Sequence, residues 1–414
     1  MALDDASDPF QQVVYLQEGD APPERLVVSY RTLEDNYTDE NLVIKIYNAS
    51  DFSIYKEYTL DGATYFYNSA FGKSEVEIDG SLVCDQLGSI YYISGDEDNG
   101  ACYYRVHKID TNTDSITTLV GPRVTGVNDK EPKVAIGIYS NGYLFITDAI
   151  NVVKINATSM TEVDRKQIPA QSWPEVVRRQ YISIIGDDSS CFICEAITWS
   201  ERKNEDQNRF HTRIYEVNTS NLSLNVLVNE NFYNNRDYAG YLLLNSRGGV
   251  VINGEPYFIV SDYYQYRDRQ FPGYDQYEFN DYIYRVYTSN GYQYELIPLR
   301  GSLIRYAVSQ FNGNLLVVWR GDPSPIAEYD PITGNLVRTV DGSEYFRDLE
   351  IEATNNNIYV FYENTNRPFP LKLQQYDGAN ISETKSITYY EPPGITDLRK
   401  STRNMAMFHS PRYT

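Results

Sequence analysis

The segment EYDPITGNLVRTV, residues 328–340, decides the fold, because it reads as two β-strands joined by a tight polar turn. Apolar and aromatic residues lead up to Asp330, and apolar residues resume at Leu336. The aspartate accounts for the turn, since Asp and Asn side chains accept hydrogen bonds from backbone N–H groups two residues on and tolerate left-handed backbone. The segment therefore predicts a β-hairpin centred just after residue 330.

The same pattern recurs seven times along the chain. In each copy a strand is followed by Asn, Asp or Thr, a short polar turn and a second strand. The seven turn positions are Asn48, Asp110, Asn156, Asn218, Thr288, Asp330 and Asp377. The intervals between them are 62, 46, 62, 70, 42 and 47 residues, and the shorter ones match the roughly 40–50 residues of a four-stranded propeller blade. The longer intervals indicate blades with inserted loops.

A second hairpin precedes several of these turns. Asn141-Gly142, Asn253-Gly254 and Asn312-Gly313 stand between apolar runs, where Asn-Gly predicts a tight hairpin because both turn positions favour positive φ. Each unit thus predicts strands A to D of one sheet. The chain predicts an all-β fold, a single seven-bladed β-propeller of four-stranded antiparallel blades. The predicted blades are residues 10–59, 75–120, 132–168, 179–228, 247–297, 302–340 and 346–388.

The turn pattern resembles the propeller superfamily that includes the YVTN and PQQ-type repeats. Asp330-Pro-Ile-Thr-Gly334, followed by Asn335-Leu-Val-Arg338, is the best match, and the resemblance covers most of the chain. It implies a propeller and little about function. The tryptophans of PQQ-type blades are missing, so quinone binding is not implied and we expect no cofactor. The chain also resembles the propeller proteins of virions and phage tails.

The two ends of the chain are predicted to have different roles. Blade one supplies four strands of its own, beginning at Gln12–Leu16, so no strand is borrowed to close the ring. The chain then divides into a propeller, residues 1–388, and a C-terminal extension, residues 389–414, which carries a charge of +2 against -23 for the rest. We expect this extension to leave the ring and to lie on an acidic surface. The alternative is that Asn404–Phe408 adds a strand to a blade.

Charge and composition restrict the partners. Of the 414 residues, 42% are hydrophobic, enough for a packed core, and the net charge is -21. Such a surface repels nucleic acid and anionic membranes, and no apolar run approaches the roughly 20 residues of a spanning helix. The first residues lack a secretory signal. We therefore expect a virion protein, or else a cytoplasmic protein or one exported without the Sec pathway.

Catalytic and metal-binding residues are not singled out by any motif. Cys191 and Cys194 have CxxC spacing but lie in an apolar strand, where residues three apart point to opposite sides, so we expect two reduced core thiols. Asp96–Gly100 has the composition of a calcium loop, but the spacing favours a solvated hairpin tip. His107, His211 and His409 are scattered. Carboxylates are abundant, so a catalytic pair of carboxylates of the glycosidase type is left as an alternative.

Three insertions are predicted on one face, where the B–C and D–A connections of blades four and five meet. They span residues 198–210, 231–241 and 262–280, and the last is rich in Tyr and Arg, the residue types enriched at interface hot spots. The alternative is a long hairpin whose aromatic side chains cover one another. The candidate binding residues are Trp199, Tyr233, Tyr238, Tyr263, Tyr264, Tyr266, Arg267, Arg269, Phe271, Tyr274 and Tyr277.

These observations support three hypotheses of function. The first is a structural or interaction protein without enzymatic activity, a virion or phage-tail component that docks other protein subunits of a large assembly or takes part in host attachment. The second is a carbohydrate-binding lectin or adhesin that uses the same aromatic face. The third is a propeller glycoside hydrolase or lyase with carboxylates at the mouth of the channel.

Overall fold

The computed structural model describes strands and turns, and within the described residues no helix. No helix of that part of the chain is long and apolar enough to span a bilayer. The all-β prediction is therefore confirmed. The described residues are 25–33, 40–61, 65–67, 75–79, 82–85, 87–98, 101–124, 133–148, 151–169, 176–187, 190–200, 208–232, 238–243, 249–267, 277–279, 283–296, 306–319, 324–342, 346–354, 356–364, 371–389 and 404–408.

The described strands form seven hydrogen-bonded sheets, which we number I to VII. Sheet I contains β32 (Asn404–Phe408), β1 (Arg25–Leu33), β2 (Glu40–Asn48) and β3 (Ile54–Asp61). Sheet II contains β6 (Leu82–Cys84), β7 (Ser89–Asp98), β8 (Ala101–Asp110) and β9 (Ser115–Val124). Sheet III contains β10 (Lys133–Ser140), β11 (Tyr143–Asp148), β12 (Asn151–Asn156) and β13 (Thr161–Gln167), with β5 (Glu75–Asp79) and β4 (Tyr65–Tyr67) added beside β10.

The remaining sheets follow in chain order. Sheet IV contains β14 (Val176–Gly186), β15 (Cys191–Ser200), β16 (Asn208–Val217) and β17 (Leu224–Phe232). Sheet V contains β18 (Tyr238–Leu243), β19 (Gly249–Ile252), β20 (Glu255–Arg267), β21 (Tyr277–Phe279), β22 (Ile283–Thr288) and β23 (Gly291–Leu296). Sheet VI contains β24 (Tyr306–Phe311), β25 (Asn314–Trp319), β26 (Pro325–Tyr329) and β27 (Leu336–Asp341). Sheet VII contains β28 (Phe346–Ala353), β29 (Asn357–Asn364), β30 (Leu371–Asp377) and β31 (Ser382–Tyr389).

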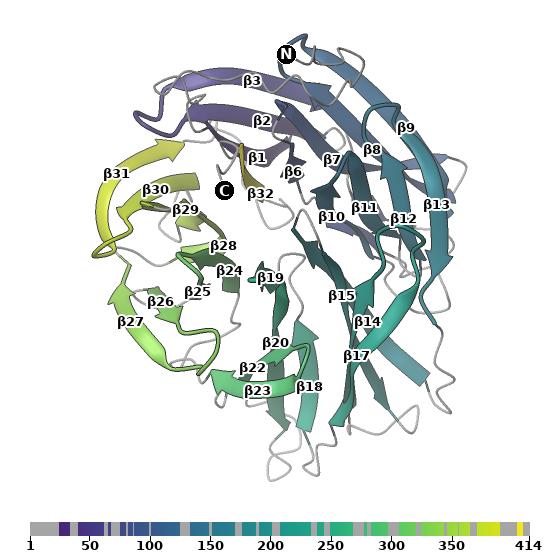
Figure 1. Ribbon diagram of the computed structural model, residues 1–414, viewed down its shortest axis with the longest axis vertical. Coiled ribbons are helices and arrows are strands. Elements are labelled where there is room, and N and C mark those ends of the chain that lie inside the picture. The colour runs from purple at the N-terminus through teal and green to yellow at the C-terminus, as the bar shows by residue number, and fades with distance from the viewer. Residues whose placement is uncertain are drawn as a thin grey trace, which may run out of the picture.

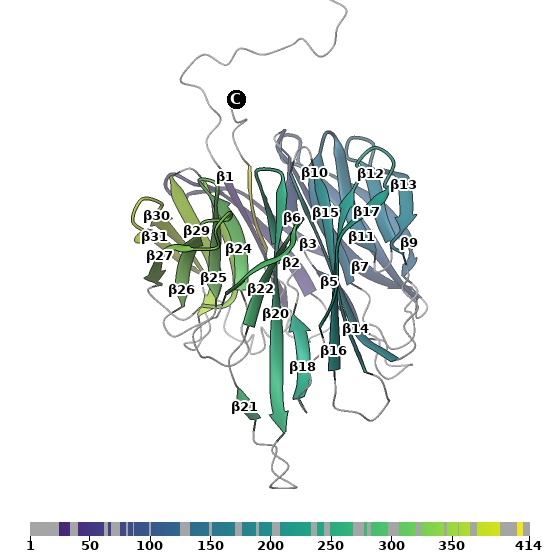
Figure 2. The ribbon, with the colours of Figure 1, turned by 60° about the horizontal axis from the view of Figure 1, so that its bottom comes forward.

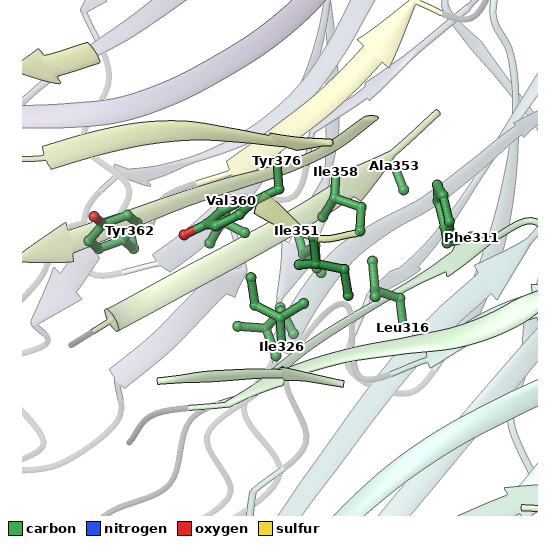
Figure 3. Packing of buried hydrophobic residues seen from close by; sticks show 12 residues of the cluster. Phe311, Leu316, Ile326, Ile351, Ala353, Ile358, Val360, Tyr362 and Tyr376 are labelled. Carbon is green, nitrogen blue, oxygen red and sulfur yellow. The ribbon is translucent and has the colours of Figure 1, made fainter. Parts of the chain in front are cut away.

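The sheets stand around a common axis, each packed face to face against its two neighbours (Figure 1). Buried apolar clusters fill the contacts of I with II, II with III, III with IV, IV with V, VI with VII and VII with I. Figure 3 shows the contact of VI with VII, where Leu316 and Ile326 meet Ile351 and Val360. Sheet V reaches sheet VI through β19, which contacts β24 and β25. The chain is therefore an all-β propeller.

The ring has two faces with different connections. The turn face carries the short turns after the inner strand and before the outer strand of each sheet, and the loop face carries the other connections. Asn141, Asn253 and Asn312 have φ of 48°, 53° and 50°, and the glycines that follow them are also at positive φ. These values confirm the Asn-Gly hairpin turns that the sequence predicts.

The turns before the outer strands share one geometry in every sheet except V, where Thr288 pairs directly with Gly291. The side-chain oxygen of Asp110, for example, accepts a bond from the backbone N–H of Asn112 at 2.9 Å, and the backbone N–H of Asp114 bonds to the Asp110 carbonyl at 2.8 Å. The fifth residue of the turn then lies in the left-handed region. In sheets I, III, IV and VII this residue is apolar and its side chain is buried against the preceding sheet of the ring. These four residues are Phe52, Met160, Leu222 and Ile381.

Basic side chains connect five of these turns, those of sheets I, II, III, IV and VII, to the preceding sheet. Lys154 of β12 donates to the carbonyl of Thr219 in the next turn at 2.7 Å, and Lys108 of β8 donates to the carbonyl of Ala157 at 3.1 Å. Charged donors strengthen such bonds to roughly twice those of neutral pairs. The same arrangement occurs at three further contacts, from Lys56 to Thr111, from Arg338 to Gly378 and Ala379, and from Lys385 to Ser50.

The closure of the ring differs from the prediction that blade one supplies all its strands. Residues 404–408 form β32, which pairs antiparallel with β1 from Arg25 opposite Phe408 to Ser29 opposite Asn404. The inner strand of sheet I thus comes from the C-terminal part of the chain, which is the alternative that the sequence left open. Such pairing satisfies the inner edge of β1, which would otherwise expose backbone donors and acceptors. Gln12–Leu16 and 390–403 lie outside the described residues, so the boundary at residue 388 stays a prediction.

The predicted start of blade two is also placed differently. Residues 75–79 form β5, which pairs in parallel with β10 of sheet III from Glu77 opposite Lys133 to Asp79 opposite Ala135. Only the three residues of β6 pair with β7 as the inner strand of sheet II. The chain therefore crosses from one sheet to the next between residues 79 and 82. Local sequence does not predict the parallel pairing of β5 with β10, because it depends on contacts between residues that are distant in the sequence.

Candidate functional site

Sheet V is the most extended sheet of the ring on the loop face. Its strand β20 is 13 residues long, and both of its edges are paired along most of that length. On one edge β19 pairs with residues 255–258 and β18 with residues 261–266. On the other edge β22 pairs with residues 258–262 and β21 with residues 265–267. The ends of β18, β20 and β21 project beyond the ring (Figure 2), and we call residues 238–243, 261–267 and 277–279 the tongue.

The backbone register of the tongue brings several predicted binding residues together. Tyr238 pairs with Tyr266, and Tyr263 pairs with Tyr241 of the same strand pair. On the other side of β20, Arg267 pairs with Tyr277. Directly opposite residues of antiparallel strands have Cα atoms about 4.5–5.5 Å apart. Positions distant in sequence therefore lie side by side in one three-stranded ladder.

The insertion of sheet IV lies next to the tongue. Strand β15 continues to Ser200 and β16 begins at Asn208, so much of the predicted loop 198–210 is hairpin. Trp199 pairs with Val177 on one side and Arg209 on the other. Strand β18 contacts both β15 and β16. The three predicted insertions are thus neighbours on the loop face.

The prediction of a 19-residue loop at 262–280 is wrong in its first part. Residues 262–267 continue β20, and 277–279 form β21. The alternation of Tyr with polar residues from Asp262 to Arg267 suits a strand, because Tyr has a high β-propensity. The pairing of β20 with β21 agrees with the hairpin of the alternative, whereas the mutual covering of its aromatic side chains stays a prediction. Tyr233, Arg269, Phe271 and Tyr274 lie outside the described residues, so their roles stay predictions.

A buried ion pair lies at the base of the sheet IV extension. Glu195 of β15 and Arg213 of β16 are opposite each other in the ladder and form an ion pair with exposures of 1% and 7%. Arg213 Nη1 also donates to the carbonyl of Pro169 at 3.1 Å, beyond the end of β13. Removing one partner of such a pair leaves a buried charge uncompensated. The pair therefore fixes the two long strands to each other and to sheet III.

The cysteines of the CxxC spacing lie on opposite faces of β15, as the sequence predicts. Cys191 packs in the cluster between sheets III and IV, and Cys194 packs in the cluster between sheets IV and V. Both are free thiols, and burial raises the pKa of each. Two side chains on opposite faces of one strand cannot bind the same ion. No group of three or more metal-ligating side chains occurs among the described residues.

A row of hydrogen-bonded side chains in sheet II has no counterpart in the sequence predictions. His107 Nε2 lies 2.7 Å from Ser94 Oγ, and His107 Nδ1 lies 2.8 Å from Thr118 Oγ1. The imidazole stacks on the Tyr92 ring with centroids 4.5 Å apart. These residues come from three different strands and have no local spacing that could identify them. Ser94 is 5% exposed, too buried to act as a nucleophile towards a substrate.

The comparisons with known proteins assign no family. No protein-family model matches the sequence, and no curated protein matches it. The chain is similar in structure to dihydro-heme d1 dehydrogenase NirN in complex with DHE, with a TM-score of 0.43, 11% identity and coverage of 92% of this chain and 74% of that chain. It is also similar to a chain of the mitotic checkpoint complex, with a TM-score of 0.43, 10% identity and coverage of 75% and 78%. Likeness at this level concerns the fold alone.

Proposed function

We propose that this chain is a docking platform of a large assembly, in which the tongue and the adjoining hairpin of sheet IV bind another protein subunit. The observation that carries the proposal is the projection of β18, β20 and β21 beyond the ring, where the register places Tyr238 opposite Tyr266 and Tyr277 opposite Arg267. Tyr is enriched at interface hot spots because a rigid amphipathic ring supplies contact area at low entropic cost. The resemblance to propellers of virions and phage tails makes a virion component our preferred assembly.

The proposal includes a ring of seven blades. Two features of the sheets support this number. Strands β18 and β19 pair with the same edge of β20 at different heights, so they act as one interrupted inner strand. Strands β4 and β5 are additions to sheet III, whose own four strands are consecutive. Each of the seven sheets then supplies one four-stranded blade.

The construction of the tongue supports a binding role over a merely structural one. Strand β18 of the tongue contacts β15 and β16 of sheet IV, which offsets part of the cost of ordering it. The end of the tongue that projects beyond the ring needs further contacts. Aromatic side chains at its positions therefore need a partner or one another to be removed from water. The high net negative charge of the chain favours a protein partner with a basic surface over a nucleic acid.

The test is the joint replacement of Tyr264, Tyr266 and Tyr274 by Ala. Hot-spot side chains cost 2 kcal/mol or more each when truncated, so partner binding should weaken by at least about a hundredfold. Thermal stability should stay nearly unchanged, because the tongue lies outside the ring. The matched control is the double change Leu87→Ala and Ile332→Ala, which removes side chains 75% and 83% exposed in turns of the opposite face.

Each outcome of this test separates the hypotheses. Loss of a protein partner in the tongue variant, with binding intact in the control, supports the docking platform. Loss of binding to immobilised glycans by the tongue variant, with no protein partner affected, supports the lectin instead. Intact binding with a large fall in stability shows that the tongue is a structural cover.

A further inference from the structure

The contact between sheets I and II combines an apolar cluster with an ion pair that crosses from one sheet to the other. Its apolar cluster includes Ile44, Ile90 and Tyr92. At the turn face, however, the left-handed turn position of sheet II is Asp114, where sheets I, III, IV and VII have a buried apolar side chain. Asp114 accepts from Lys56 Nζ at 2.6 Å and from Tyr58 OH at 2.7 Å, both from β3. An ion pair thus connects these two sheets where an apolar side chain connects others.

His107 lies at the same contact. Tyr104 and Val106 of β8 pack against sheet III, so the alternation of the strand turns residues 105 and 107 towards sheet I. Tyr92, on which the imidazole stacks, belongs to the cluster between sheets I and II. Both ring nitrogens of His107 are engaged by hydroxyl groups of neighbouring strands. The ring therefore lies on the side of β8 that faces sheet I, bonded to two other strands of sheet II.

Acid acts on both groups in the same direction. Burial, with a smaller contribution from Arg105, lowers the pKa of His107 from 6.5 to about 4. The unfolded chain thus binds a proton at this residue that the folded chain resists, and stability falls as the pH drops from 6.5 towards 4. The bonds from Lys56 and Tyr58 lower the pKa of Asp114 below 3.8, so its ion pair is lost at still lower pH.

The other charged and titratable groups at this contact do not offset these effects. The charge of Arg105 opposes a second positive charge beside it. Burial and the Asp114 carboxylate raise the pKa of Tyr58, so it stays a neutral donor. Lys56 loses its carboxylate partner when Asp114 is protonated. The carboxylates of the ion pairs Glu195–Arg213 and Glu328–Arg338 bind an arginine of their own sheet. Across the contacts with the neighbouring sheets these arginines donate to backbone carbonyls, which do not titrate.

We propose that the contact between sheets I and II is an acid-sensitive seam, which loosens on acidification before the other intersheet contacts of the ring. Sheet I is also the sheet in which β32 closes the ring. Loosening at the seam therefore releases one face of sheet I, in which the strands nearest the two ends of the chain, β1 and β32, are paired. The ring is thereby built to open at one place in an acidic environment.

The native cysteines report on this opening. Cys84 is partly buried against the cluster between sheets I and II, whereas Cys191 and Cys194 are buried at the contacts of sheet IV. The full chain is treated at pH 7.0, 5.5 and 4.0 with dithiodipyridine, which reacts with thiols in acid, and each labelled cysteine is identified by peptide mass mapping. Rates are divided by those of an unstructured cysteine peptide. The relative rate at Cys84 should rise at least tenfold by pH 4.0 while Cys191 and Cys194 stay protected.

Two variants identify the responsible groups. His107→Gln keeps hydrogen-bonding capacity and removes the proton site, so it should suppress the rise at Cys84 between pH 6.5 and 4. Asp114→Asn, at an exposed turn position, should raise the rate at Cys84 already at pH 7.0. The control Asp330→Asn makes the same chemical change at the first residue of the turn in sheet VI, away from the seam, and should leave Cys84 unaffected.

Three results would overturn the proposal. Labelling of Cys84, Cys191 and Cys194 at one pH would mean that acid unfolds the ring as a whole. A relative rate at Cys84 that stays constant down to pH 4.0 would mean that the seam does not open. An equal rise at Cys84 in the wild type and the His107→Gln chain would remove His107 from the account, and Asp114→Asn tests the seam independently if His107→Gln fails to fold.

Discussion

Leu222 gives the sharpest test of how the turns connect the sheets. It lies at the left-handed position of the turn between β16 and β17, with φ of 56°, and its side chain is 0% exposed in the cluster between sheets III and IV. Replacing Leu222 by Ala removes a fully buried side chain and should cost about 3 kcal/mol of unfolding free energy. Left-handed backbone costs Ala about 1 kcal/mol and glycine almost nothing.

Leu222→Gly should therefore be at least as stable as Leu222→Ala, which reverses the usual order of the two residues inside regular structure. Gly334 occupies the equivalent position in sheet VI with φ of 69°, so the turn accommodates glycine. Urea unfolding of both variants, followed by circular dichroism, measures the difference. The control Val226→Ala, at a side chain 51% exposed in the same sheet, should change stability by less than about 0.5 kcal/mol.

The reasoning is refuted in either of two ways. If Leu222→Ala costs less than about 1 kcal/mol, the side chain does not connect sheets III and IV. If Leu222→Gly is less stable than Leu222→Ala by about 1 kcal/mol, the left-handed backbone does not set the residue preference of this turn.

Two further predictions concern the contacts that hold the ring together. Truncation after residue 403 removes β32, so the inner edge of β1 loses its partner, and the chain should aggregate or be strongly destabilised. A truncated chain with the same unfolding midpoint as the full chain would contradict the closure of the ring by β32. Lys154→Met should lower the unfolding free energy measured in urea by about 1–3 kcal/mol, because it leaves the Thr219 carbonyl without its charged donor. Lys108→Met breaks a longer bond at a more exposed site and should cost less. The opposite order of the two costs would contradict the assigned role of these lysines.

The sequence predicts the repeated turns because their chemistry is local. Asp110 and Asp330 bond backbone N–H groups two residues on, and Asn141 adopts positive φ before glycine, and each of these features depends on residues close in sequence. The buried apolar residue at the fifth turn position, such as Met160, is also present in the sequence at constant spacing. Whether this residue is buried, however, depends on the left-handed backbone, which turns its side chain towards the preceding sheet.

Strand partners and side-chain networks are not predictable in this way. Residues 404–408 pair with β1 and residues 75–79 with β10, and both are choices among distant edges that no local pattern fixes. His107 meets Ser94 and Thr118 only because three strands are aligned in register. In the candidate site, the clustering of the insertions follows from propeller topology and could be predicted. The extension of β20 to Arg267 could have been recognised from the alternation of Tyr with polar residues.

The claim that the tongue is the docking surface is tested most directly by locating the residues that a partner subunit contacts. A photo-crosslinking phenylalanine derivative at Tyr277, in β21 of the tongue, replaces one aromatic ring by another, and the control carries it at Tyr55, an exposed ring of β3 on the rim. Both chains are irradiated in the assembly of their native source, and the adducts are identified by mass spectrometry. A docking platform predicts a protein adduct of one subunit at Tyr277 and none at Tyr55. The same adduct at Tyr55, with none at Tyr277, would place the working surface elsewhere and contradict the account.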